Sequence, residues 1–170
     1  MEKNRYVNSN VSVNPELEVE NIKFVSQEKI DEVMAVVNSL KFEQMNKKLM
    51  NEYAWSEKDI SLGNIAYKRW LVLAACYPDF KLVPTQKLDE YWHMHILDTK
   101  KYMEDCQLVF GEYLHHYPYF GTEGDGDYAD KCFTVTKELF IKHFREKISN
   151  ESGDCCNTPC GTHGCRNNCN

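Results

Sequence analysis

The stretch LVPTQKLDEYWHMHILDTKKYMEDCQLVFGEYLHH, residues 82–116, carries the pattern that decides the fold. Thr85 is a residue type that commonly caps the start of a helix, and Gly111 is one that commonly ends it. Between them, apolar side chains recur at helical spacing and are expected to form a buried face: Leu88, Trp92, Ile96 and Met103. We therefore expect one long helix over residues 86–110.

A second face of this expected helix is polar. Its five members follow one another at steps of four, three, four and three residues: Tyr91, His95, Asp98, Tyr102 and Asp105. Such steps place all five on one stripe. An aspartate one turn from a histidine can fix the tautomer of the ring, or it can join the ring as a metal ligand. His95 with Asp98 could do either, and so could Asp89 with His93.

Helical geometry limits which histidines can share an ion. His93 and His95 are two positions apart, about 200° around a helix, so they should not bind the same ion. Further ligands would then come from His115 and His116, which follow the expected turn at Gly111. The stripe can also be interpreted as a hydrogen-bonded seam between helices, with Trp92 in the core and Cys106 as a buried structural thiol. The sequence leaves both interpretations open.

Three further helices are expected around this one. The first runs from an N-cap at Ser26 to about residue 50, and the second from a capping box at Ser56 to just before Pro78. A break of the second helix near Gly63 is left open. The last helix is expected over residues 128–148 and should pack through apolar side chains: Cys132, Val135, Leu139, Phe140 and Phe144. The fold class is therefore all-α, a compact bundle-like domain of four to five helices.

The chain divides into three parts by composition. Residues 1–22 are polar and rich in asparagine, and we expect a disordered lead-in. Residues 23–149 form the helical domain. Residues 150–170 form a cysteine-rich tail without aliphatic side chains, which cannot build a core.

Composition and charge argue against several classes of protein. The hydrophobic content of 42% is that of an ordinary globular chain, and the net charge of −6 disfavours binding to nucleic acid or to anionic membranes. No apolar run approaches the roughly 18 residues of a membrane span, and the N-terminus lacks the apolar core of a signal peptide. We therefore expect a cytoplasmic protein. Signatures of hydrolases, nucleotide triphosphatases and dehydrogenases are not found.

The tail concentrates metal-binding side chains. Five of the eight cysteines and one histidine lie within its last sixteen positions: Cys155, Cys156, Cys160, His163, Cys165 and Cys169. In a reducing compartment such a cluster indicates metal binding or redox chemistry rather than a disulfide framework. Thiolates with an imidazole suit zinc, copper(I) or iron, and the spacing does not select among them. A thiol-rich segment that is modified or oxidised, or an inert tail, stays an alternative.

Two segments resemble a known family. YKRWLVLAACYP, residues 67–78, and the stretch over residues 82–116 are similar to the glycine-rich domain-containing protein-like family, here as a short form without the glycine-rich tract. The resemblance covers about residues 55–120. It implies shared site positions without naming a ligand: Asp89, Trp92, His93, His95, Asp98, Tyr102, Asp105 and Cys106. The RNA-binding region of some plant members has no counterpart here, so we expect no nucleic-acid partner.

These observations predict an intracellular metal-binding protein. The tail would capture a soft metal ion, and the helical domain would hold a second site at His93 or His95. One alternative is a small metalloenzyme that uses His95, Asp98 and either His115 or His116, with Tyr102 as a proton donor. Another is a protein-interaction or leader-type module that carries the thiol-rich segment for modification.

Overall fold

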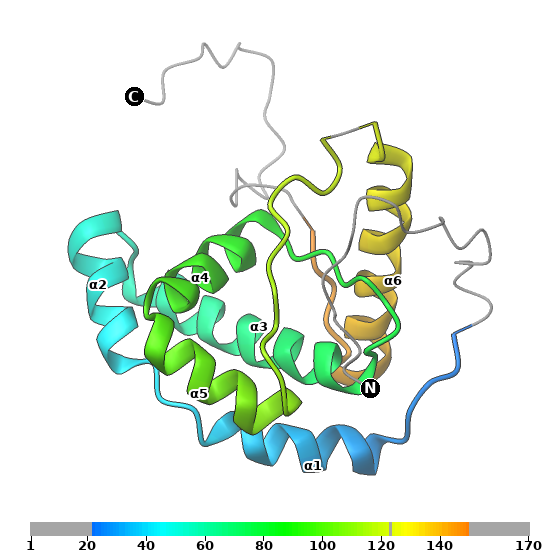
Figure 1. Cartoon of the computed structure of the whole chain (residues 1–170), viewed down its shortest axis with the longest axis horizontal. Coiled ribbons are helices and arrows are strands. Elements are labelled where there is room, and N and C mark those ends of the chain that lie inside the picture. The colour runs from blue at the N-terminus through cyan, green and yellow to red at the C-terminus, as the bar shows by residue number, and fades with distance from the viewer. Residues whose placement is uncertain (1–21, 123, 150–170) are drawn as a thin grey trace, which may run out of the picture.

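The computed structural model describes residues 22–122 and 124–149, and every regular element in these ranges is an α-helix. The helices follow one another as α1 (Gln27–Asn38), α2 (Glu43–Tyr53), α3 (Glu57–Cys76), α4 (Gln86–Leu97), α5 (Thr99–Phe110) and α6 (Gly126–Phe144) (Figure 1). The predicted all-α class is confirmed. The expected cysteine-rich tail and all but the last residue of the expected lead-in lie outside the described residues. No described helix combines the length and the hydropathy that a membrane span requires.

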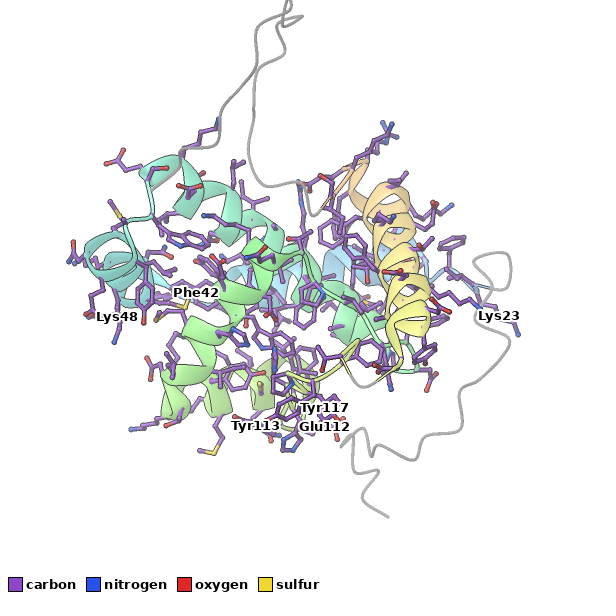
Figure 2. All side chains as sticks on the ribbon, turned by 90° about the horizontal axis from the view of Figure 1, so that it is seen from above. Lys23, Phe42, Lys48, Glu112, Tyr113 and Tyr117 are labelled. Atoms are coloured by element: carbon purple, nitrogen blue, oxygen red, sulfur yellow. The ribbon has the colours of Figure 1, made fainter. Side chains whose placement is uncertain are left out.

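Helix α3 is the centre of the domain. It contacts α1, α2, α4, α5 and α6, and Figure 1 shows it running through the middle of the molecule. Its start is fixed by the predicted capping box, in which Ser56 and Asp59 exchange backbone and side-chain hydrogen bonds. Four consecutive residues, 70–73, are at most 2% exposed, which shows that the helix is buried on several sides. Side chains from the surrounding helices fill the space against it (Figure 2).

The helix predicted from Ser26 to about residue 50 is two helices. Ser26 caps α1 as expected, but the chain turns after Asn38, and α2 begins at Glu43. Leu40 and Phe42 are 5% and 3% exposed, respectively. Residues two positions apart point to opposite sides of a straight helix, so a single helix could not bury both. The turn lets both side chains enter the core.

The helix predicted over residues 86–110 is also divided, at Asp98. Thr85 caps α4 and Gly111 ends α5 with a φ of 72°, both as predicted. Between them the ψ of 70° at Asp98 takes the backbone out of helical geometry. The Asp98 side chain accepts a hydrogen bond from the backbone nitrogen of Lys101 at 3.4 Å, which is how aspartate caps a new helix.

Because the expected helix is two helices, the side chains that it buries differ from those predicted. Trp92 is 6% exposed, as expected, but Met103 is 57% exposed because α5 has its own axis and its own buried side. The polar stripe contributes three of its members to the core instead, Tyr91, His95 and Tyr102, each at most 2% exposed.

Two smaller expectations also change. Helix α3 passes through Gly63 without a break. Helix α6 begins two residues earlier than predicted and ends at Phe144, where Arg145 adopts the left-handed conformation with a φ of 55°. Four of its five predicted core positions are buried, Cys132, Val135, Leu139 and Phe140, whereas Phe144 is partly buried and packs against the core.

Gly63 lies in α3 against two aromatic rings. A Cβ at this position would come within 2.8 Å of Trp55 Cζ3 and 3.0 Å of Tyr91 Cδ2. Glycine to alanine in an exposed helix interior stabilises by up to about 1 kcal/mol. Because both rings belong to the packed core, we expect Gly63→Ala instead to lower the free energy of unfolding by about 1–3 kcal/mol, measured by urea denaturation. The exposed Ser61→Ala in the same helix is the control, expected within about 0.5 kcal/mol of the parent chain. A more stable Gly63→Ala would contradict this close packing.

Candidate metal centre

Asp89, His93 and His116 form a cluster of three metal-ligand side chains, the only such group within residues 22–122 and 124–149. Asp89 and His93 lie one turn apart on α4. His116 comes from the segment that follows α5 and includes Leu114 and His116, called here the return segment. This segment passes beside α4 (Figure 1). One ligand atom from each residue lies within 4.8 Å of the other two. The cluster therefore joins two parts of the chain that are more than twenty residues apart.

The distances in the cluster resemble those around a bound ion. His116 Nε2 lies 2.9 Å from Asp89 Oδ1 and 3.1 Å from His93 Nε2, while His93 Nε2 lies 3.6 Å from Asp89 Oδ2. With bonds of about 2.1 Å, neighbouring ligand atoms lie about 3.0–3.4 Å apart in octahedral or tetrahedral geometry. The separations bracket this range, although the two histidines approach different oxygens of Asp89, and one oxygen and the two ring nitrogens all lie within 4.8 Å of one another. Small side-chain shifts would therefore bring all three atoms into the coordination shell of one ion.

The hydrogen-bonding directions within the cluster also favour a bound cation. His116 Nε2 faces the Asp89 carboxylate and the second imidazole, and one ring N–H cannot point well along both directions. A cation that accepts a lone pair from each residue satisfies all three groups at once. The side chains of His93, Asp89 and His116 are 48%, 33% and 14% exposed, so such an ion could be reached from solvent.

A chain of buried hydrogen bonds positions His116. Trp92 Nε1 donates to Tyr102 Oη at 2.9 Å, and Tyr102 Oη donates to the carbonyl oxygen of Leu114 at 2.6 Å. The rings of Trp92 and His116 lie 4.4 Å apart between centroids. The core therefore holds both the backbone of the return segment, at Leu114, and the ring of His116. Burial raises the pKa of Tyr102 well above its usual range, and its hydroxyl proton is already donated to Leu114.

His95 lies apart from this cluster, in the core. Its Nδ1 is 2.8 Å from Tyr67 Oη, and its Nε2 is 3.1 Å from Asp105 Oδ2. Asp105 in turn forms an ion pair with Lys101 Nζ at 2.7 Å. The predicted partner was Asp98, one turn away on a single helix. Because the chain turns at Asp98, Asp105 comes close to His95, whereas ten residues of straight helix would separate them by about 15 Å.

The hydrogen bonds define the state of the His95 ring. The Asp105 carboxylate faces Nε2 and favours the proton of the neutral ring there, so Nδ1 is left as the acceptor for the hydroxyl of Tyr67. Burial lowers the pKa of His95 to about 4, outweighing the opposite influence of the Asp105 carboxylate. His95 is therefore neutral at physiological pH and acts as a structural hydrogen-bonding group.

The remaining predicted positions have other surroundings. The ring of His115 packs against Tyr113, 4.9 Å away between centroids, and is not part of the cluster. Asp98 caps α5, and Tyr91 Oη donates to Asn46 Oδ1 at 2.6 Å inside the domain. The six metal-binding side chains predicted in the tail lie outside the described residues.

Of the domain ligands predicted from sequence, His93 and His116 come together, and His95, Asp98 and His115 do not join them. The third member, Asp89, was predicted as a candidate site position that could either fix the tautomer of His93 or join it as a metal ligand. Its spacing from His93 was the available signal, since residues four apart on a helix are neighbours.

The neutral His95 makes stability depend on pH. Its pKa is about 4 in the folded chain and about 6.5 when unfolded, so between these values the unfolded state binds the extra proton. Stability is therefore lost as the pH falls through this window, by up to about 3 kcal/mol from this group. Urea denaturation of the chelator-treated chain at several pH values measures the loss. His95→Gln should be less stable at neutral pH but should show a shallower dependence between pH 6.5 and 4. Equal slopes for the two chains would contradict the assignment.

Comparison with known proteins identifies a family. No curated protein and no solved structure matches the chain. A family model described as UCP032817-like matches residues 32–147. This range covers more than half of the chain and includes all three residues of the cluster, so the protein belongs to the UCP032817-like family.

Proposed function

We propose that this protein binds a transition-metal ion at Asp89, His93 and His116, and that the cysteine-rich tail is a second site for a soft metal ion. The observation that carries the first site is the convergence of two imidazole nitrogens and a carboxylate from two separate segments. Hydrogen bonds from the core fix the segment that supplies His116. The second site rests on the composition of the tail.

The ligand types indicate which ions suit each site. Two imidazoles and one carboxylate suit zinc or iron(II), whereas calcium and magnesium prefer sites made of oxygen ligands. Thiolates in the tail select softer ions, copper(I) and zinc among them. The two sites therefore differ in the metals that they would retain under competition.

The cluster supplies three ligands, which leaves at least one coordination position for water or another small ligand. His93 is the most exposed member, so this position would be open to solvent. Three protein ligands with an open position are typical of catalytic zinc sites, whereas structural sites usually have four protein ligands. This feature favours a metalloenzyme as the second candidate function, built on Asp89, His93 and His116. The resemblance to the glycine-rich domain-containing protein-like family and the interaction-module alternative stay predictions.

The metal content of the purified chain tests the proposal. The full chain and a version that ends at Asn150 are purified under reducing conditions without chelators, and plasma mass spectrometry gives metal per chain. We expect the shortened chain to retain about one ion. We expect His93→Ala and His116→Ala in the shortened chain to lose it, because each removes one of three ligands.

His115→Ala is the matched control, since it removes the neighbouring imidazole without touching the cluster. It should retain metal. If His115→Ala loses as much metal as His116→Ala, the cluster is not the site. If the shortened chain binds no zinc or iron(II) even after reloading, the domain site does not exist, and any metal in the full chain belongs to the tail.

A further inference from the structure

An ion at Asp89, His93 and His116 has fewer protein ligands than it can bind. Within the described residues, no further ligand atom from a histidine, cysteine, aspartate or glutamate joins this group. Zinc in a structural site takes four protein ligands, so one position is left for another donor. Two neutral imidazoles and one carboxylate also leave a divalent ion with one uncompensated positive charge. A single anionic ligand would fill the position and balance this charge.

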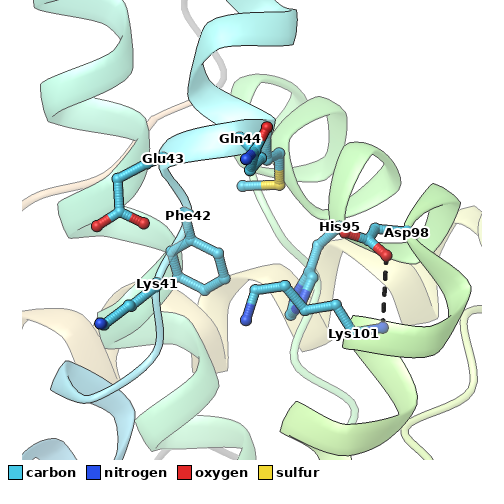
Figure 3. A pocket seen from close by; sticks show the side chains of 8 residues that line it. Lys41, Phe42, Glu43, Gln44, His95, Asp98 and Lys101 are labelled. Carbon is cyan, nitrogen blue, oxygen red and sulfur yellow. Dashed lines mark hydrogen bonds between the residues drawn. The ribbon is translucent and has the colours of Figure 1, made fainter.

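Other side chains of the domain that could bind a metal lie away from the cluster. Cys106 and Cys132 are buried, and Cys76 is half-buried and packs against the core. Figure 3 shows His95 and Asp98 at a pocket of about 280 Å³ between the start of α2 and the junction of α4 and α5. None of the three cluster residues lines this pocket. The fourth ligand therefore does not come from these side chains.

The cysteine-rich tail follows a segment that is held against the central helix α3. The side chains of Glu146 and Arg69 form an ion pair, and the Arg69 guanidinium lies over the Phe144 ring, with Cζ 5.2 Å from its centre. Ile148, two residues before the tail, packs against the core. The chain therefore leaves the domain from a defined position beside α3, which also contacts α4, the helix that supplies two of the cluster residues.

A series of contacts limits how far this position lies from the cluster. Trp70 follows Arg69 in α3, and its ring lies 4.5 Å from the Trp92 ring between centroids. The Trp92 ring lies 4.4 Å from the His116 ring. With bonds of about 1.5 Å along the connecting side chains, the path from the Glu146 backbone to the His116 ring is roughly 30 Å long. The direct distance cannot exceed the length of this path.

The last three cysteines of the tail can span this distance. Cys160, Cys165 and Cys169 follow Glu146 by 14, 19 and 23 residues. Fourteen residues reach roughly 46 Å when fully extended, so all three thiols can reach the cluster while the domain stays folded. A tether of this length presents its thiols at an effective concentration in roughly the millimolar range. Thiolate is also a preferred zinc ligand, together with imidazole and carboxylate.

From this geometry we infer that a thiolate from one of these three cysteines is the fourth ligand of the ion at the cluster. The inference rests on the proposed domain site. A bond forms between the cysteine Sγ and the ion, a water molecule leaves the ion, and the thiol proton goes to solvent. The other thiols of the tail remain for a soft ion. The thiolate closes the domain site to other small ligands.

Cobalt(II) is the probe, because its bonds to thiolates give a near-ultraviolet charge-transfer band that its bonds to imidazole and carboxylate lack. Three full-length chains each keep one of Cys160, Cys165 and Cys169, with the other four tail cysteines replaced by serine. Each is stripped of metal, reduced with a phosphine and given about one cobalt ion per chain. We expect the band in at least one chain, with the intensity of a single thiolate, and its loss when His116→Ala is added.

His115→Ala in the same chain is the matched control and should keep the band. A band that survives His116→Ala would place the thiolate and its ion elsewhere and overturn the inference. So would a band that depends on protein concentration, since the thiolate would then come from a second copy. Absence of the band from all three chains, while the chain that ends at Asn150 retains cobalt, would overturn the inference and leave the domain site standing. Failure of that shortened chain to retain cobalt would refute the domain site, and this inference with it.

Discussion

Asp98 ends one helix and begins the next, and the arrangement of the functional groups depends on this turn. Its backbone leaves helical geometry, while its carboxylate caps the new helix through the backbone nitrogen of Lys101. The turn folds α5 back along α4, so that Asp105 approaches His95 and Tyr102 approaches Trp92. With an uninterrupted helix none of these contacts could form, because the partners would be separated along a single axis.

Helix α4 carries its two histidines on different sides, and the surroundings give each a different chemistry. His95 lies in the core, where burial keeps its ring neutral and the Asp105 carboxylate favours the tautomer with its proton on Nε2. His93 lies at the surface, where its lone pair can be offered to an ion together with Asp89. Two imidazoles two residues apart therefore have unrelated roles, one supporting the fold and the other available for binding. The return segment brings His116 to the side of α4 that carries His93, not to the side that carries His95.

Local signals in the sequence predict much of the fold, whereas contacts between distant residues decide the rest. The caps at Ser26, Ser56 and Thr85 and the stop at Gly111 are local, because each depends on a side chain or a glycine beside the helix end. The turn after Asn38 is not, since it follows from the need to bury both Leu40 and Phe42 against other helices. The spacing of apolar residues along one helix does not show that both side chains must be buried against other helices.

The candidate metal site also combines a local signal with a contact between distant residues. The pair Asp89 and His93 is local and visible as spacing on a helix. His116 joins it only when the return segment lies on α4, and that position depends on hydrogen bonds from Trp92 through Tyr102 to Leu114. An ion that binds all three ligands is therefore bound by the folded arrangement and not by the separate segments. Binding then stabilises the return segment on the core, since whatever binds only the folded state shifts the equilibrium toward it. In this protein the packing of Trp92 and Tyr102 in the core controls the geometry of the Asp89, His93 and His116 cluster at the surface.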